Sequence, residues 1–181
     1  LYLFFHFILF NFFKLFPIKN KIVFLVSFKD NNLFTYRELI NKKFTGEIVF
    51  LCSKNMYSVI KKSVNVPVFV IESGKIRDEI MASYHMATAK TILVDNYYGF
   101  LAVMKFKKGV ECIQIWHAAG ALKNFGFLDH SVHKRSKRAK KRFTRVYRNF
   151  HKVVVNSRAF ARIFELAFNI REDQFLFFGY P

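Results

Sequence analysis

Residues 110–126 read VECIQIWHAAGALKNFG, and the interpretation of the whole chain begins from this stretch. The apolar run from Val110 to Ile115 predicts a buried strand, and the small residues after His117 allow a helix or tight loop to begin there. A strand followed by a helix is the repeating unit of α/β domains, whose functional groups follow the carboxyl ends of the strands. We therefore expect His117 at such an end.

The residue types in this stretch indicate chemistry on a phosphate group. Histidine is the side chain whose ordinary pKa lets it exchange protons near neutral pH. Gly120 allows backbone N–H groups to approach an anion, and Lys123 adds a fixed positive charge in a helix that would start at Ala118. A proton acceptor beside an anion pocket indicates attack of a hydroxyl on phosphate. The alternative is a hydrogen-bonded structural histidine, the commoner role of a lone histidine after a strand.

Short strand and helix signals alternate on both sides of this stretch. The alternation predicts an α/β fold, a Rossmann-like three-layer domain with a parallel sheet covered by helices on both faces. No glycine-rich nucleotide-binding signature follows any of the strands. Besides 110–115, strands are expected at 22–28, 48–52, 66–71, 91–94, 153–155 and 174–178, and helices at 33–43, 57–63, 75–86 and 158–168.

Two polar residues, Asp95 and Asn96, follow the strand expected at 91–94, on the same sheet edge as His117. Asp95 is a candidate to orient the His117 imidazole or to accept a hydrogen bond from a substrate hydroxyl. Capping of a turn or helix is the alternative. Cys52 and Cys112 are far apart and lack the spacing of a zinc site or a disulfide framework, so the sequence predicts no metal site.

The charge of the chain points to an anionic partner. Thirty Lys and Arg residues against 12 Asp and Glu give a formal net charge of +18. Basic residues crowd the range 134–152, where apolar residues recur at spacings of three and four, which predicts a basic amphipathic helix from Lys134 to Lys152. Such a helix suits an anionic membrane surface or a polyphosphate chain, and a solvated surface is the alternative. Nucleic-acid binding is not expected, because no zinc-finger spacing or RNP motif accompanies the helix.

Residues 1–18 are predicted to be a hydrophobic, membrane-associating segment. The run is shorter than the roughly 20 apolar residues that a spanning helix needs. Lys14, Lys19 and Lys21 would lie at the headgroups of an interfacial anchor. A helix buried in the core is the alternative.

Four sequence pieces occur in order along the chain: AKTILVDNY at 89–97, IWHAAGALK at 115–123, VVVNS at 153–157 and FGYP at 178–181. Together they resemble the CDP-glycerol glycerophosphotransferase family, which builds teichoic acid chains in Gram-positive bacteria. The resemblance covers about residues 20 to 181. It implies that 19–181 is the N-terminal, acceptor-side half of a two-domain GT-B-type fold. The donor-binding C-terminal domain is absent, so the chain is expected to be part of a longer protein.

The resemblance also implies an activity. A polyol phosphate would pass from CDP-glycerol or CDP-ribitol to a polyprenyl-linked teichoic acid acceptor. No cofactor is specified, and metal dependence stays open. The protein would be peripheral, at the cytoplasmic face of the plasma membrane. The catalytic residues implied are His117 and Asp95, and the implied substrate contacts are Asn96, Trp116, Gly120, Lys123 and Ser157.

Two alternatives stay open at the level of sequence. Many family members carry WHGTPLK where this chain has WHAAGALK, a variant that resembles the branch with chain-extending and ribitol-using transferases. Glycerol and ribitol, and priming and polymerisation, are therefore both possible. Because the donor-binding half is absent, a noncatalytic membrane-associated module that binds the acceptor or a lipid is the alternative function.

Overall fold

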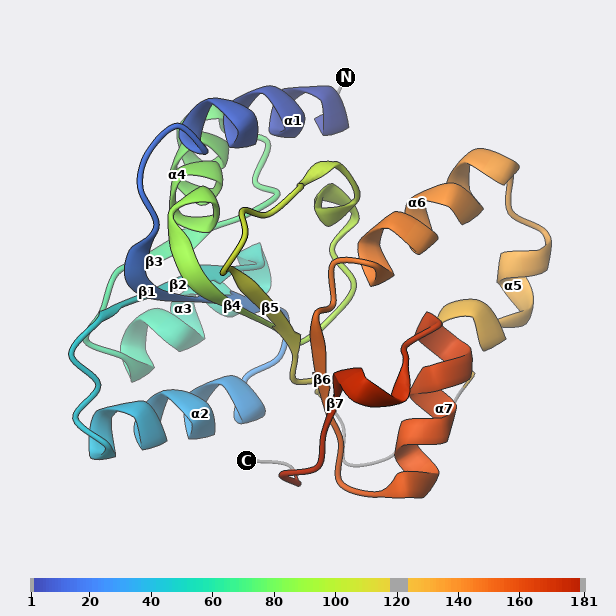
Figure 1. Cartoon of the computed structure of the whole chain (residues 1–181). Coiled ribbons are helices and arrows are strands. Elements are labelled where there is room, and N and C mark those ends of the chain that lie inside the picture. The colour runs from blue at the N-terminus through green and yellow to red at the C-terminus, as the bar shows by residue number, and fades with distance from the viewer. Residues whose placement is uncertain (1, 118–123, 180–181) are drawn as a thin grey trace.

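One parallel sheet forms the centre of the molecule (Figure 1). The computed structural model describes residues 2–117 and 124–179, apart from the side chain of His133. Within this part of the chain the sheet has seven strands, in the order β3-β2-β1-β4-β5-β6-β7. The strands are β1 (Lys19–Val26), β2 (Glu47–Cys52), β3 (Val68–Val70), β4 (Ala89–Val94), β5 (Glu111–Gln114), β6 (Lys152–Val154) and β7 (Phe175–Leu176).

The order of the strands indicates where along the sheet a functional site is expected. The chain builds outward from β1 to β3 and then returns to lay β4 on the other side of β1. In doubly wound sheets, ligands bind outside the carboxyl ends of the strands at this point of reversal. Leu25 pairs with Val94, and Val94 pairs with Gln114, so β1, β4 and β5 end side by side. The predicted Rossmann-like fold is confirmed.

Strand β1 shows why the sheet is central. Val23 and Leu25 belong to the apolar core on one face of the sheet, and Phe24 and Val26 belong to the core on the other face. All four side chains are fully buried. A near-continuous apolar run of this kind is the signature of a parallel strand that helices cover on both sides.

The helices form layers above and below the sheet (Figure 1). Helices α2 (Asp30–Asn41) and α3 (Lys54–Ser63) share one core with the sheet. The other core takes side chains from α4 (Ile76–Ala87), α6 (Lys137–Tyr147), α7 (Arg158–Phe168) and the 3₁₀ helix η1 (Gly99–Val103). The short elements are α5 (His130–His133), η2 (Gly126–Leu128) and η3 (Glu172–Gln174).

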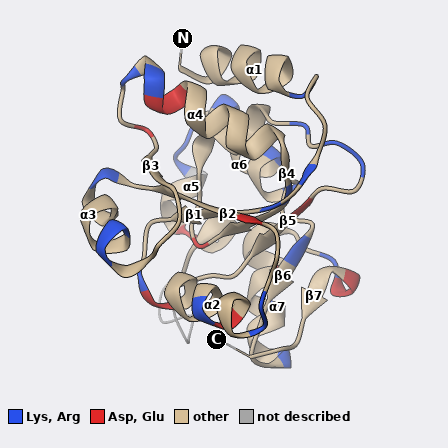
Figure 2. Cartoon of the chain, turned by 90° about the vertical axis from the view of Figure 1, so that its left-hand side faces the viewer, with Lys and Arg blue, Asp and Glu red and all other residues tan. Residues whose placement is uncertain are grey.

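Helix α1 (Tyr2–Phe13) lies across α4 and η1 as an outer layer. His6 and Phe10 are buried against the core, whereas Phe4, Phe7 and other apolar residues of α1 are exposed. The helix carries no charged residue (Figure 2). Helix α1 is therefore packed on the domain. The alternative of a core helix describes its inner side, its outer side is an exposed apolar surface, and membrane association stays a prediction.

Most expected elements are present, with shifted ends. The basic helix expected from Lys134 to Lys152 is wrong in its extent, because α6 covers only Lys137–Tyr147. The Ser136 hydroxyl accepts a hydrogen bond from the Ala139 N–H and so starts the helix after Lys134 and Arg135. Lys152 begins β6. Strand β7 is shorter than the expected 174–178, and η1 was not foreseen.

No helix within 2–117 and 124–179 combines the length and apolar character needed to cross a bilayer.

Candidate active site

His117 follows β5 at the edge where β1 and β4 also end. Trp116, immediately before it, has a left-handed backbone with a φ of 56°, which is uncommon for a residue that has a Cβ atom. The Trp116 N–H donates to the Gln114 side-chain oxygen at 2.9 Å and holds this turn. The prediction that His117 lies at the end of a buried strand is confirmed.

The hydrogen bond of His117 determines which tautomer its neutral form adopts. Its Nδ1 atom lies 2.7 Å from the backbone carbonyl oxygen of Asp95. A carbonyl oxygen can only accept, so in the neutral form Nδ1 carries the hydrogen and Nε2 has the lone pair. The neutral imidazole thus presents Nε2 as a proton acceptor, the form that a general base requires.

Two aromatic rings fix the plane of the imidazole. The Phe28 ring stacks on His117 with ring centroids 3.9 Å apart and an interplanar angle of 12°. The Trp116 ring stacks at 4.3 Å and 30°. Phe28 lies just beyond the end of β1, so the ends of β1, β4 and β5 all position the ring of His117. His117 itself is partly exposed.

The Asp95 carboxylate does not contact the imidazole, contrary to one expectation from the sequence. It is fully buried and accepts hydrogen bonds from the N–H groups of Ser27 and Phe28, the Asn32 amide and the Tyr98 hydroxyl. Burial raises the pKa of the Asp95 carboxyl group, and these hydrogen bonds limit the rise. Through these hydrogen bonds, the Asp95 side chain connects the end of β1 and the start of α2 to the end of β4. Only the backbone carbonyl of Asp95 orients His117. The capping alternative does not describe the carboxylate either, because the backbone donors Ser27 and Phe28 lie just beyond the end of β1, 68 and 67 residues away.

Asn31 also supports the site, and the sequence interpretation missed it. Its amide donates to the carbonyl oxygen of Trp116 at 3.2 Å and to that of Ile115 at 3.4 Å. The usable signal was the Asn31-Asn32 pair directly after a buried strand, because side-chain amides there can bind neighbouring backbone groups.

A small cavity of about 110 Å³ lies beside the site. Its polar lining comes from Asn96 and Gln114, whose side-chain amide donates to the Asn96 carbonyl at 3.3 Å. Trp116 also lines it, and its indole N–H is buried with no acceptor among the described residues. The expected substrate contacts Asn96 and Trp116 thus meet at one place, next to His117.

The other expected contacts stand apart from this group. Ser157 is an exposed helix cap whose hydroxyl accepts from the Phe160 N–H at 3.2 Å, and no recorded contact between described residues joins it to His117. Gly120 and Lys123 lie outside the described residues. The site within the described chain therefore consists of His117 and the groups that orient it.

Metal-binding side chains do not gather in the described part of the chain, where no group of three His, Cys, Asp or Glu residues could hold an ion. Cys52 and Cys112 are buried free thiols. Burial raises the pKa of Cys52 to about 12, which keeps the thiol protonated.

Comparison with known proteins gives consistent relatives. Residues 8–181 match the family described as CDP-Glycerol:Poly(glycerophosphate) glycerophosphotransferase. The teichoic acid glycerol-phosphate primase of Bacillus spizizenii is 36% identical over 162 residues, covering 90% of this chain and 42% of the primase. The teichoic acid poly(ribitol-phosphate) polymerase of the same organism is 30% identical, covering 98% of this chain and 26% of the polymerase.

Solved structures agree on the fold. A CDPG-soaked variant of the wall teichoic acid polymerase TagF superposes with a TM-score of 0.73 at 16% identity, covering 97% of this chain and 44% of the polymerase. The chain spans less than half the length of these relatives.

Proposed function

Because residues 8–181 place the chain in the CDP-glycerol:poly(glycerophosphate) glycerophosphotransferase family, we propose that it supplies the acceptor-side half of a teichoic acid polyol-phosphate transferase. The donor is CDP-glycerol or CDP-ribitol, and the acceptor is a hydroxyl group of a lipid-linked teichoic acid chain. The names of the relatives include glycerol-phosphate primases and ribitol-phosphate polymerases, which supports this substrate class.

The observation that carries the proposal is the fixed tautomer of His117. Nδ1 donates to the Asp95 carbonyl, so Nε2 is the atom that takes the proton of the acceptor hydroxyl. The hydroxyl oxygen then forms a bond to the β-phosphorus, the bond from that phosphorus to the oxygen of CMP breaks, and CMP leaves. Positioning and charge stabilisation dominate phosphoryl transfer, so a rigid base is valuable here.

Other residues support the base rather than react. Asn31 holds the backbone of Trp116, and Phe28 holds the plane of the imidazole. Asn96 and the Trp116 indole border the adjoining cavity, where they can bind the acceptor or a phosphate oxygen. Asp95 acts as a positioning residue through its carbonyl. Gly120, Lys123 and Ser157 remain proposed substrate contacts on the strength of the family resemblance.

Peripheral membrane attachment at the cytoplasmic face is part of the proposal. The exposed side of α1 presents Phe4, Phe7, Ile8 and Phe12 to solvent. Large exposed apolar patches mark surfaces that bind other molecules or membranes. The same patch favours a second candidate function, a noncatalytic module that holds the lipid-linked acceptor for another protein.

Replacing the base tests the proposal. His117→Ala, in a protein that carries this chain and spans the full length of its relatives, should lower the rate of CMP release by about 10²- to 10⁴-fold. CMP release is measured from CDP-glycerol and from CDP-ribitol, with a lipid-linked acceptor present.

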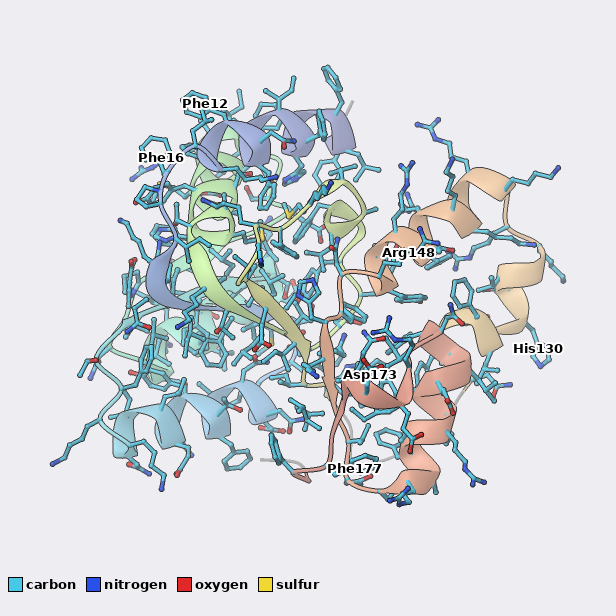
Figure 3. The ribbon with its side chains drawn as sticks, viewed as in Figure 1. Phe12, Phe16, His130, Arg148, Asp173 and Phe177 are labelled. Carbon is cyan, nitrogen blue, oxygen red and sulfur yellow. The ribbon has the colours of Figure 1, made fainter. Side chains whose placement is uncertain are left out.

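The matched control is His130→Ala, because His130 is an exposed histidine on α5 at the outer edge of the molecule (Figure 3). Both variants should keep the urea midpoint of the parent. Equal CMP release from the parent and from His117→Ala would reduce His117 to a structural residue. No release with either donor would favour the noncatalytic module.

A further inference from the structure

A basic groove lies between α6 and residues of α1 and η1. In Figure 1, α6 and α1 lie on the side of the sheet away from α2. The volume of the groove is about 380 Å³. One wall is apolar and is formed by Leu3 of α1 with Ala102 and Val103 of η1. The other wall is formed by the side of α6 that carries Ser136, Arg138, Ala139, Lys141, Arg142 and Arg145.

Four cations line one wall of this groove without a counter-charge. Arg138 lies three and four residues before Lys141 and Arg142, and Arg145 lies four and three residues after them, so the four share one side of α6. Among the described residues, no carboxylate lies within 4.0 Å of the charged atoms of these four side chains. The sequence itself contains no acid between Asp129 and Glu165. Like charges at these spacings repel, so an anion in the groove would stabilise them.

One of the four cations has an unused donor in the protein interior. The Nε atom of Arg142 is buried and has no hydrogen-bond acceptor among the described residues. A buried donor without an acceptor costs free energy. The Arg142 guanidinium also lies near the Tyr97 phenol, whose pKa it lowers against the effect of burial. Arg142 lines the groove, and the guanidinium fork matches the oxygens of a phosphate group.

The groove is held in shape by its surroundings. The Asn149 amide, just beyond the end of α6, donates to the carbonyl oxygens of Leu101 and Met104 at 2.6 and 2.9 Å. Phe143 and Val146 anchor the inner side of α6 in the core. The helix that carries the cations is therefore held in place, so binding does not require its backbone to be reordered.

The apolar wall indicates where the phosphate comes from. Leu3 belongs to the helix whose outer side exposes Phe4, Phe7, Ile8 and Phe12, and Figure 3 shows Phe12 and Phe16 pointing away from the sheet. A phosphate held by α6 would thus lie beside a surface suited to acyl chains. We propose that the groove between α6 and η1 binds the phosphate group of an anionic membrane lipid.

This site is separate from His117 and does not depend on polyol-phosphate transfer. The proposal concerns lipid binding alone, so a protein without transferase activity tests it equally well.

Matched pairs of neutralised cations test the groove. The groove variant is Arg138→Gln with Arg145→Gln, and the control is Lys61→Gln with Lys62→Gln at the end of α3; all four residues are exposed, and each pair removes two charges. Cosedimentation of the 181-residue chain with phosphatidylcholine vesicles containing phosphatidic acid measures its affinity for an anionic lipid surface. The groove variant should bind about tenfold or more weakly, because each cation near the surface contributes about 1 kcal/mol. The control should change by less than about twofold.

Each outcome of these experiments either supports the lipid site or overturns it. Equal losses in both pairs would mean diffuse charge attraction and would overturn the site, as would no loss in either. Inorganic phosphate at constant ionic strength should compete with the vesicles for the parent and not for the groove variant. Calorimetric phosphate binding that the groove variant loses, with vesicle binding unchanged, would assign the groove to soluble phosphate. A loss confined to binding of a single-stranded oligonucleotide would assign it to nucleic acid and overturn the lipid proposal.

Discussion

Asp95 serves the site through two different groups of the same residue. Its carboxylate is buried among donors from β1 and α2, and its carbonyl accepts from the imidazole of His117. A charged group without water is tolerated only when hydrogen bonds surround it, and here four donors do so. The side chain therefore stabilises the sheet edge on which the candidate base stands.

Replacing the Asp95 carboxylate should lower the stability of the fold more directly than it changes the catalytic step. Asp95→Asn replaces one carboxylate oxygen with an NH2 group. The hydrogens of this group would face the N–H groups of Ser27 and Phe28, which are also donors. We expect the free energy of unfolding to fall by about 2–4 kcal/mol, measured by urea denaturation. Asp129→Asn is the control, because Asp129 is only a local cap whose carboxylate accepts from the Ser131 N–H. A urea midpoint for Asp95→Asn equal to that of the parent would contradict this account.

Helix α1 has one side that is buried in the core and one side that is exposed to solvent. Phe10 is 1% exposed and packs edge-on against Phe106, whereas Phe7 is 48% exposed. The helix has almost no polar residues to mark the difference, so the sequence alone did not show which side faces the core. Only the docking of α1 on α4 and η1 decides it.

The two sides of α1 should respond differently to truncation. Phe10→Ala should lower the free energy of unfolding by about 3–5 kcal/mol through loss of packing and cavity formation. Phe7→Ala should change it by less than about 0.5 kcal/mol. Urea denaturation measures both, and cosedimentation of the folded proteins with vesicles should show a several-fold loss only for Phe7→Ala. Equal vesicle binding by both variants would exclude α1 as the membrane contact.

At the scale of the whole molecule, buried histidines make stability depend on pH. Burial lowers the pKa of His6 and of His85 to about 4, and it also lowers that of His151. The Lys21 ammonium group, 3.2 Å from Nδ1 of His85, adds to the effect there. Between the unfolded value of 6.5 and about 4, the unfolded chain binds protons that the folded chain excludes. Stability is therefore present above pH 6.5 and is lost as the pH falls.

His85 provides the test of this dependence. The parent should lose more unfolding free energy between pH 7 and pH 5 than His85→Gln does, by about 1–2 kcal/mol. Urea denaturation at the two pH values gives the difference. Burial raises the pKa of Glu79, which acts in the opposite direction, but the subtraction removes its contribution. Parallel changes in the parent and in His85→Gln would show that His85 is not responsible.

The sequence predicted the fold well because each strand carries its own apolar run. The ranges 48–52 and 158–168 were placed within one residue of β2 and α7, and His117 was placed correctly after β5. The support of the site was harder to see, since Asn31 and Phe28 lie more than 80 residues away from His117 in the chain and reach it only through the topology of the sheet. Asp95 was misjudged because a sequence does not distinguish a carboxylate from the carbonyl of the same residue.

The left-handed turn at Trp116 has a practical consequence. The chain contains one tryptophan, and its indole ring stacks on His117 and borders the adjoining cavity. The tryptophan fluorescence of the protein therefore originates beside the candidate base, and its emission reports on the occupancy of that place without any attached label.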